Sequence, residues 1–490
     1  MPSQFAQFEA RGDLLSVRLT ADELSFTPER VWNPSPSRAH RTEPYPVPQA
    51  LQIGIQGNQE TGAKFSPPPF AVEIESSGDG ARTLLCVAAD AGWHRWNEVL
   101  FDAQADSVTC TIDLEGHTSP ADAAEHVRLL LLPGEPDESR HELLARGLRE
   151  TYPAASGQAG RSAPDWWTKP IYCGWGDQVS TCMWLEGPGP EDRALAYCLQ
   201  GLHERWLRRL DEAEAPIGSI IIDAGWSPAG VWEPDTVKWP DLRGFIDAQH
   251  QMGRKVLLWL ATWLWDGLPD EWCVFAGDIK LTADPTNPDY MACLRERVAE
   301  MVSPEGLDAD GFKIDQLAYC PNQRRPRGGP RFGRTDSYEA PREPIRLHGD
   351  SWGCELLYRL QKAIYDAAKS AKPDCLITSS TVHPYFHDTF DMTRLHDTGI
   401  VSGDVIEAMR ARSDLSRAAL PGKPIDADDW VSTDYDQWMR YTCGSHALGV
   451  PCLFYAERFM ADWHNEPTTS PIPLEDLRRI GNAWREAGVV

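Results

Sequence analysis

The sequence has 490 residues, a formal net charge of −26 and 42% hydrophobic residues, among them 20 tryptophans. This length exceeds the usual size of one domain, and the acidic balance argues against nucleic acid or an anionic membrane surface as a partner. The longest apolar run, 256–265, is too short to cross a bilayer, and residues 1–14 lack a secretory pattern.

Short β-rich segments broken by Gly, Pro and Asp fill residues 1–135, which is typical of an antiparallel sandwich. The expected strands are 14–19, 51–55, 70–74, 83–88 and 107–114. Residues 138–152 then place Leu143, Leu144 and Leu148 on one face of an amphipathic helix. The small, polar stretch 157–164 predicts a linker. We therefore expect an N-terminal β-sandwich with its linker helix over 1–155.

The second predicted domain, 156–490, alternates apolar strands with amphipathic helices. The expected strands are 169–175, 219–226, 255–263, 311–315, 375–379, 392–397, 423–428 and 450–455. The clearest helices are 192–210, 290–302, 354–371, 404–419 and 435–448. This count predicts an α/β fold, a (β/α)8 TIM barrel. A doubly wound open sheet is the alternative, but Gly174-Trp175-Gly176-Asp177 is too bulky for a dinucleotide loop.

Twelve cysteines are scattered along the chain without a CxxC pair or the His-rich spacing of a zinc site. We therefore expect reduced, buried thiols and a cytoplasmic protein that holds no metal ion and no cofactor. A metal-dependent hydrolase is also disfavoured because histidines are nearly absent from the predicted strand ends.

The fourth predicted strand carries two opposite charges, Lys313 and Asp315, on the same side because side chains alternate along a strand. Buried opposite charges are costly unless they pair or take part in chemistry. In a barrel, catalysis takes place at the C-terminal ends of the strands. The Lys-x-Asp strand end therefore predicts a catalytic site, with an ion pair that only closes the strand as the alternative.

Other predicted strand ends carry carboxylates and tryptophans. Aromatic faces can cover the C–H surface of a sugar, carboxylates can accept its hydroxyl hydrogens, and two carboxyls can hydrolyse a glycosidic bond. The expected rim residues are Trp175, Asp177, Asp223, Trp226, Trp259, Trp263, Lys313, Asp315, Ser379, Ser380, Arg394, Asp397, Asp426, Asp428, Tyr455 and Glu457. Their convergence predicts a carbohydrate site.

The barrel resembles the clan of melibiase-type α-galactosidases and related retaining α-glycosidases, glycoside hydrolase families 36, 27 and 31. Ile222-Asp223-Ala224-Gly225-Trp226 resembles a melibiase Asp-Asp-Gly-Trp strand end. Phe312-Lys313-Ile314-Asp315 resembles the strand that carries the nucleophile, and 392–398 resembles the segment that carries the acid/base. The resemblance implies Asp315 as the nucleophile and Asp397 as the acid/base of a retaining mechanism.

The same resemblance implies substrate contacts in the pocket. Asp223 would accept sugar hydroxyl hydrogens, and Lys313 would favour the ionised nucleophile by its opposite charge. The further expected substrate-binding residues are Trp175, Trp226 and Trp259 as pocket walls, Asp177 as a second carboxylate, and Arg394. His396 flanks the acid/base, where a structural hydrogen bond is the simpler expectation.

The sequence departs from the melibiase pattern at Ala224, which replaces the second Asp, and at 379–384, which replaces a Cys-x-Gly-Gly signature. Plain α-galactosides are therefore expected to be weak substrates. Segment 320–347 carries seven arginines and is expected to cover part of the pocket, either contacting an anionic substrate group or pairing with nearby acids.

The expected partner is an oligosaccharide or glycoside. A transglycosylase on the same site and a non-catalytic sugar-binding barrel stay as alternatives, and the oligomeric state, including a homo-oligomer, stays open.

Overall fold

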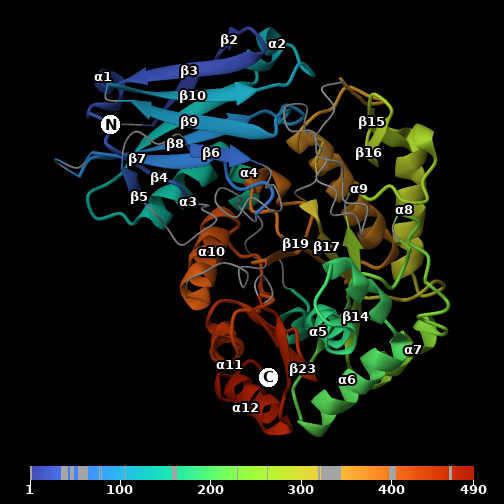
Figure 1. Cartoon of the computed structure of the whole chain (residues 1–490). Coiled ribbons are helices and arrows are strands. Elements are labelled where there is room, and N and C mark those ends of the chain that lie inside the picture. Colours follow the sequence, from blue (N-terminus) through green and yellow to red (C-terminus); the bar gives the residue numbers. More distant parts are fainter. Residues whose placement is uncertain are drawn as a thin grey trace.

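The computed structural model describes residues 3–34, 42–44, 49–52, 65–76, 78, 80–104, 106–156, 163–228, 230–261, 263–317, 320–321, 344–396, 404–462 and 466–490. The N-terminal sheets, blue to cyan in Figure 1, lie beside a barrel surrounded by helices. No helix among the described residues is long and apolar enough to span a membrane.

Two antiparallel sheets form the N-terminal part, as the sequence predicts. The six-stranded sheet has the order β1 (Gln4–Gln7), β11 (Val127–Pro133), β8 (Arg82–Ala89), β7 (Ala71–Glu75), β4 (Arg30–Trp32) and β5 (Thr42–Pro44). The five-stranded sheet has the order β2 (Glu9–Arg11), β3 (Leu14–Thr20), β10 (Ser107–Asp113), β9 (Glu98–Gln104) and β6 (Gln49–Gln52). Buried positions alternate with partly exposed ones along β9 and β10, because one face of that sheet packs on the core.

Helix α3 (Arg140–Thr151) is the amphipathic helix expected over 138–152. Ser139 and Glu142 form a capping box at its start, so two backbone donors of the first turn are satisfied. Leu143, Leu144 and Leu148 are buried against the six-stranded sheet. The short helix α4 (Pro153–Ser156) follows, and most of the expected linker, 157–162, lies outside the described residues.

Eight parallel strands close into the predicted barrel. Their order is β12 (Ile171–Cys173), β13 (Ser219–Ile222), β14 (Lys255–Ala261), β17 (Gly311–Asp315), β19 (Leu376–Ser379), β20 (Met392–Arg394), β21 (Ile425–Ala427) and β22 (Val450–Leu453). Each matches an expected strand, and most are shorter than expected. Strands such as β13 and β14 are almost continuously apolar because helices cover their outer side and the barrel interior covers the other.

Helices surround this barrel (Figure 1). They are α5 (Trp175–Glu186), α6 (Gln200–Glu212), α7 (Leu242–Gln251), α8 (Pro288–Val302), α9 (Cys354–Ala371), α10 (Val405–Ala419), α11 (Tyr435–Gly444) and α12 (Leu474–Glu486). The helix expected over 192–210 is divided into a 3-10 segment, Glu191–Tyr197, and α6. Leu199, at the start of α6, offers no side-chain cap hydrogen bond.

Two small sheets extend the barrel. Strands β15 (Cys273–Ala276) and β16 (Ile279–Ala283) lie between β14 and α8, and β18 (Ile345–Arg346) pairs with β15. The chain after β17 therefore returns to the segment that follows β14. Most of the arginine-rich stretch, 322–343, lies outside the described residues. Strands β23 (Arg458–Ala461) and β24 (Thr468–Pro471) form a hairpin after β22.

Candidate active site

The Lys313 and Asp223 side chains form an ion pair inside the C-terminal end of the barrel. Lys313 Nζ lies 2.7 Å from Asp223 Oδ2, and the two side chains are 5% and 4% exposed. The Cys173 thiol donates to the same oxygen at 3.0 Å, and the Ala224 N–H donates to Asp223 Oδ1 at 2.8 Å. Burial lowers the pKa of Lys313, but the Asp223 carboxylate outweighs burial and holds that pKa well above its usual value. Lys313 therefore keeps its positive charge at neutral pH, in direct contact with the Asp223 carboxyl group.

Asp315, the predicted nucleophile, ends β17 and has a side chain that is 22% exposed. Its Oδ2 accepts a hydrogen bond from Trp259 Nε1 at 3.1 Å. Its Oδ1 accepts one from the Gln316 N–H at 2.8 Å and lies 3.3 Å from His396 Nε2 and 3.6 Å from an Arg394 Nη1. Burial raises the pKa of Asp315, but Arg394 and His396 outweigh burial, so the pKa lies well below its usual value. The carboxyl is thus ionised, the state that a nucleophile needs.

Arg394 on β20 lies beside Asp315 and is fixed by contacts with Asp428 and the backbone of β17. Its Nε and Nη2 lie 2.8 and 2.7 Å from Asp428 Oδ2, and its Nη1 donates to the Ile314 carbonyl at 3.0 Å. The side chain is 1% exposed. This burial differs from the sugar contact expected from the sequence and points to a role in orienting and charging the Asp315 site.

His396 follows β20 with a backbone φ of +61°. Its N–H donates to Asp428 Oδ1 at 2.9 Å, and its carbonyl accepts from an Arg412 Nη1 at 2.6 Å. The neighbouring residue, Asp397, lies outside the described residues, as do 398–403. The predicted acid/base therefore stays a prediction.

The three tryptophans expected as pocket walls are mostly buried. Trp259 is 4% exposed, and its indole N–H is used by Asp315. Trp226 is 1% exposed and donates from Nε1 to the Trp259 carbonyl at 2.9 Å. Trp175 packs edge to face on Trp430, with ring centroids 6.1 Å apart. Trp259 therefore positions Asp315 directly, and Trp226 does so indirectly by a hydrogen bond to the backbone of Trp259.

Asp177, expected from the sequence as a substrate contact, is hydrogen-bonded to groups of the protein. The side chain is fully buried and accepts hydrogen bonds from the Tyr172 hydroxyl at 2.7 Å and from the N–H groups of Ala456 at 2.6 Å and Glu457 at 3.0 Å. Burial raises the pKa of Asp177 to about 7, against the hydrogen bonds that favour the charged form. The carboxyl ties the start of α5 to the chain that leaves β22, where the barrel closes.

Sequence reasoning did not identify Cys173 and Arg412 as parts of the site, because a thiol in a strand and an arginine in a helix carry no motif. Asp426 is a further buried carboxyl whose two oxygens have no hydrogen-bond partner among the described residues. Burial, together with the Asp428 charge, holds the pKa of Asp426 well above its usual value. Asp426 and Asp428 were both among the rim residues expected from the sequence; Asp426 lies on β21, and Asp428 directly follows that strand.

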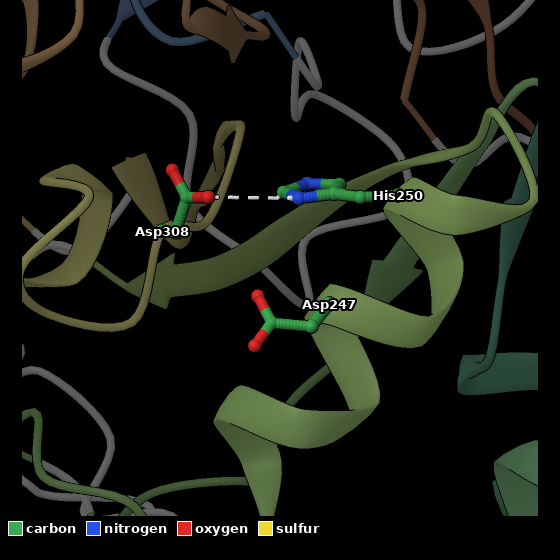
Figure 2. Close-up of side chains that lie close together, drawn as sticks. All are labelled: Asp247, His250 and Asp308. Atoms are coloured by element: carbon green, nitrogen blue, oxygen red, sulfur yellow. Dashed lines mark ion pairs between the residues drawn. The ribbon is translucent and has the colours of Figure 1, made fainter.

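One group among the described residues has metal-ligand spacing, formed by Asp247, His250 and Asp308 (Figure 2). It lies at the other end of the barrel, before β17. Arg243 Nε pairs with Asp247 at 2.9 Å, and Lys372 Nζ pairs with Asp308 at 2.9 Å. Because each carboxylate already has a cationic partner, this group is an ion network and does not need a metal ion.

The fold is similar to that of enzymes of cycloalternan metabolism. The cycloalternan-degrading enzyme from Trueperella pyogenes matches with a TM-score of 0.59 at 15% identity, over 99% of this chain and 70% of that chain. Its structure with a covalent intermediate matches with a TM-score of 0.56 at 15% identity, over 99% and 65%. The cycloalternan-forming enzyme from Listeria monocytogenes, in complex with a pentasaccharide substrate, matches with a TM-score of 0.53 at 13% identity, over 97% and 42%.

This chain therefore spans about two thirds of the degrading enzyme and less than half of the forming enzyme. No family model and no curated protein matches the sequence. At identities of 13–15%, the similarity establishes the fold.

Proposed function

We propose that this protein is a retaining α-glycosidase that removes α-linked sugars from an oligosaccharide, with Asp315 as the nucleophile and Asp397 as the acid/base. The observation that carries the proposal is Asp315 itself. It is an ionised carboxylate at the C-terminal end of the fourth barrel strand, held by Trp259 and His396 beside a buried cation. That is the position and charge state of a glycosidase nucleophile.

In the proposed reaction, an Asp315 oxygen attacks the anomeric carbon while Asp397 gives its proton to the leaving glycosidic oxygen. The glycosidic C–O bond breaks and an ester to Asp315 forms. Asp397 then removes a proton from water, which attacks the anomeric carbon and releases Asp315. Two displacements give a product with the same anomeric configuration as the substrate.

The sugar is proposed to be α-glucose, not α-galactose. Ala224 offers only a methyl group where a melibiase has its second carboxylate, and a buried substrate hydroxyl without a partner loses about 1–3 kcal/mol. The similar structures also point to glucans, since one of them was solved with isomaltose. Asp223, which is paired with Lys313, is proposed to accept hydroxyl hydrogens of the terminal sugar.

The test compares isomaltose, a cyclic α-glucan and the nitrophenyl α-glycosides of glucose, galactose and xylose as substrates. The proposal expects turnover of an α-glucoside, retention of the anomeric configuration by NMR, and a loss of several orders of magnitude in Asp315→Ala. Asp436→Asn, on an exposed turn of α11, is the matched control. Inversion, or an Asp315→Ala variant within about tenfold of wild type, would contradict the proposal.

Transfer of the sugar to another sugar hydroxyl, in place of water, is the second candidate. The match to a cycloalternan-forming enzyme favours it, because the same ester intermediate can serve both reactions. Chromatography of products from isomaltose decides between them, since hydrolysis yields glucose alone, whereas transfer yields one glucose together with a longer or cyclic product.

A further inference from the structure

His396 lies where the chain leaves the sixth barrel strand, next to the proposed nucleophile. Its Nε2 is 3.3 Å from Asp315 Oδ1, and its side chain is 13% exposed. We propose that His396 is a positioning residue, which orients Asp315 and stabilises its carboxylate form through a hydrogen bond from its Nε2–H. This inference rests on the proposed function and adds a residue to which the resemblance gives no role.

The backbone of His396 is fixed in a conformation that aims the ring at Asp315. Its φ of +61° is in the left-handed region, where histidine is more frequent than most residues. Asp428 holds the N–H, and Arg412 donates to the carbonyls of both Leu395 and His396. A strained backbone persists when its surroundings determine it from several sides, and such sites cluster where function needs a fixed geometry.

The hydrogen-bond partners of the ring indicate its tautomer. His396 Nδ1 is buried and has no hydrogen-bond partner among the described residues, whereas Nε2 faces a carboxylate oxygen that can only accept. Nε2 therefore carries the proton of the hydrogen bond to Asp315. Among the described residues, Asp315 contacts the ring and Arg394 contacts Asp315, while Asp428 and Arg412 contact the backbone of His396.

The hydrogen bond from His396 suits both displacements of the proposed chemistry. Asp315 is negative before the attack and becomes a neutral ester afterwards, so the charge of Arg394 stabilises the starting state more than the ester. Asp428 largely offsets the charge of Arg394. His396 keeps its Nε2 proton throughout both displacements and fixes the plane of the Asp315 carboxyl.

The test uses three variants. His396→Gln keeps an amide donor of similar reach, His396→Phe keeps a ring without a donor, and His396→Asn tolerates the left-handed backbone but is too short to reach Asp315. Without the donor, the pKa of Asp315 rises. The acidic limb of the kcat/KM profile is therefore expected to move up by about one pH unit in the Phe and Asn variants, with kcat roughly tenfold lower and KM little changed. His396→Gln is expected to remain close to wild type in both.

Equal losses in all three variants with an unmoved acidic limb would overturn the proposal, because a purely structural residue gives that result. A readout independent of turnover is the titration of the Asp315 carboxyl by NMR in aspartate-labelled protein, with its signal identified in Asp315→Asn. The expected result is a higher Asp315 pKa in His396→Asn than in His396→Gln. An unchanged pKa would reject the role of His396, whereas absent α-glycosidase activity in the wild type would reject only the proposed function.

Discussion

Lys313 pairs with Asp223 and not with Asp315, although Lys313 and Asp315 face the same side of one strand. The ammonium contacts Asp223, which follows β13, whereas Asp315 is paired with Arg394 at the end of β20 and with His396, which follows β20. The charge of the nucleophile is therefore set mainly by a different strand from its own. The buried ion pair of Lys313 and Asp223 is thus separate from the contacts of the proposed nucleophile, Asp315.

Replacing one partner of the buried pair is expected to be strongly destabilising. Lys313→Met leaves Asp223 as an uncompensated buried charge, which costs about 3–5 kcal/mol of the free energy of unfolding. The double variant with Asp223→Asn should recover part of that loss in urea unfolding. Arg18→Gln, which breaks an exposed pair with Asp106, is the control and should cost less than about 1 kcal/mol. A Lys313→Met cost as small as that of the control would show that the pair is not a buried ion pair.

Asp177→Asn distinguishes between two roles of Asp177, a structural one and a substrate-binding one. The structural role predicts a loss of roughly 2 kcal/mol of stability, because backbone N–H groups lose a charged acceptor, with KM for the substrate nearly unchanged. Thermal unfolding and Michaelis–Menten kinetics on the same preparation measure both. A KM that rises severalfold with no loss of stability would instead restore the substrate contact expected from the sequence.

Gly311 begins the strand that carries Lys313 and Asp315. Its φ is +142°, and a Cβ there would lie 1.9 Å from the Leu376 carbonyl oxygen on β19. Gly311→Ala is therefore expected to push the two strands apart, with a loss of roughly 2–3 kcal/mol of stability and lower kcat. Gly201→Ala, on α6 with open space around it, is the matched control and should be neutral or slightly stabilising. Equal unfolding midpoints for the two variants would contradict this account.

Acid is expected to weaken the contact between the N-terminal sheets and the barrel. His94 and His383 are buried with ring centroids 5.5 Å apart, and burial lowers the pKa of His383 to about 3 and that of His94 well below its usual value. An unfolded histidine has a pKa of about 6.5, so the unfolded state binds more protons below that pH. The contribution of the two uncharged histidines to the free energy of unfolding is therefore fully present above pH 6.5 and is lost as the pH decreases toward 3.

His383→Phe isolates the contribution of His383 to the pH dependence of stability. The other titratable side chains near the two rings, among the described residues, include Tyr152, Tyr385 and Glu355, and they remain in the variant. Their contributions cancel when the unfolding free energies of variant and wild type are subtracted at each pH. The difference should grow in favour of the variant between pH 6.5 and 4.5, by up to about 1.4 kcal/mol per pH unit. A difference independent of pH would show that His383 does not titrate on unfolding.

Much of the fold could be predicted because it depends on local patterns. Continuous apolar runs such as β14 and strand–helix alternation predicted the barrel, and a Lys-x-Asp strand end located Asp315. The partners inside the barrel could not be predicted, because they depend on which strands face one another across its interior. Asp177 shows the limit best. It lies shortly after β12, in the first turn of α5, which begins at Trp175 and turns the carboxylate toward the backbone after β22.

The central claim is that Asp315 forms a covalent bond to the sugar, and trapping that ester tests it most directly. The protein is incubated with a 5-fluoro-α-glucosyl fluoride, which slows the second displacement, and is then digested and analysed by mass spectrometry. The account predicts one added fluoroglucosyl group on the peptide that contains Asp315, and none in Asp315→Asn. Turnover of an α-glucoside with the label on another residue, or with no label and an inverted product, would contradict it.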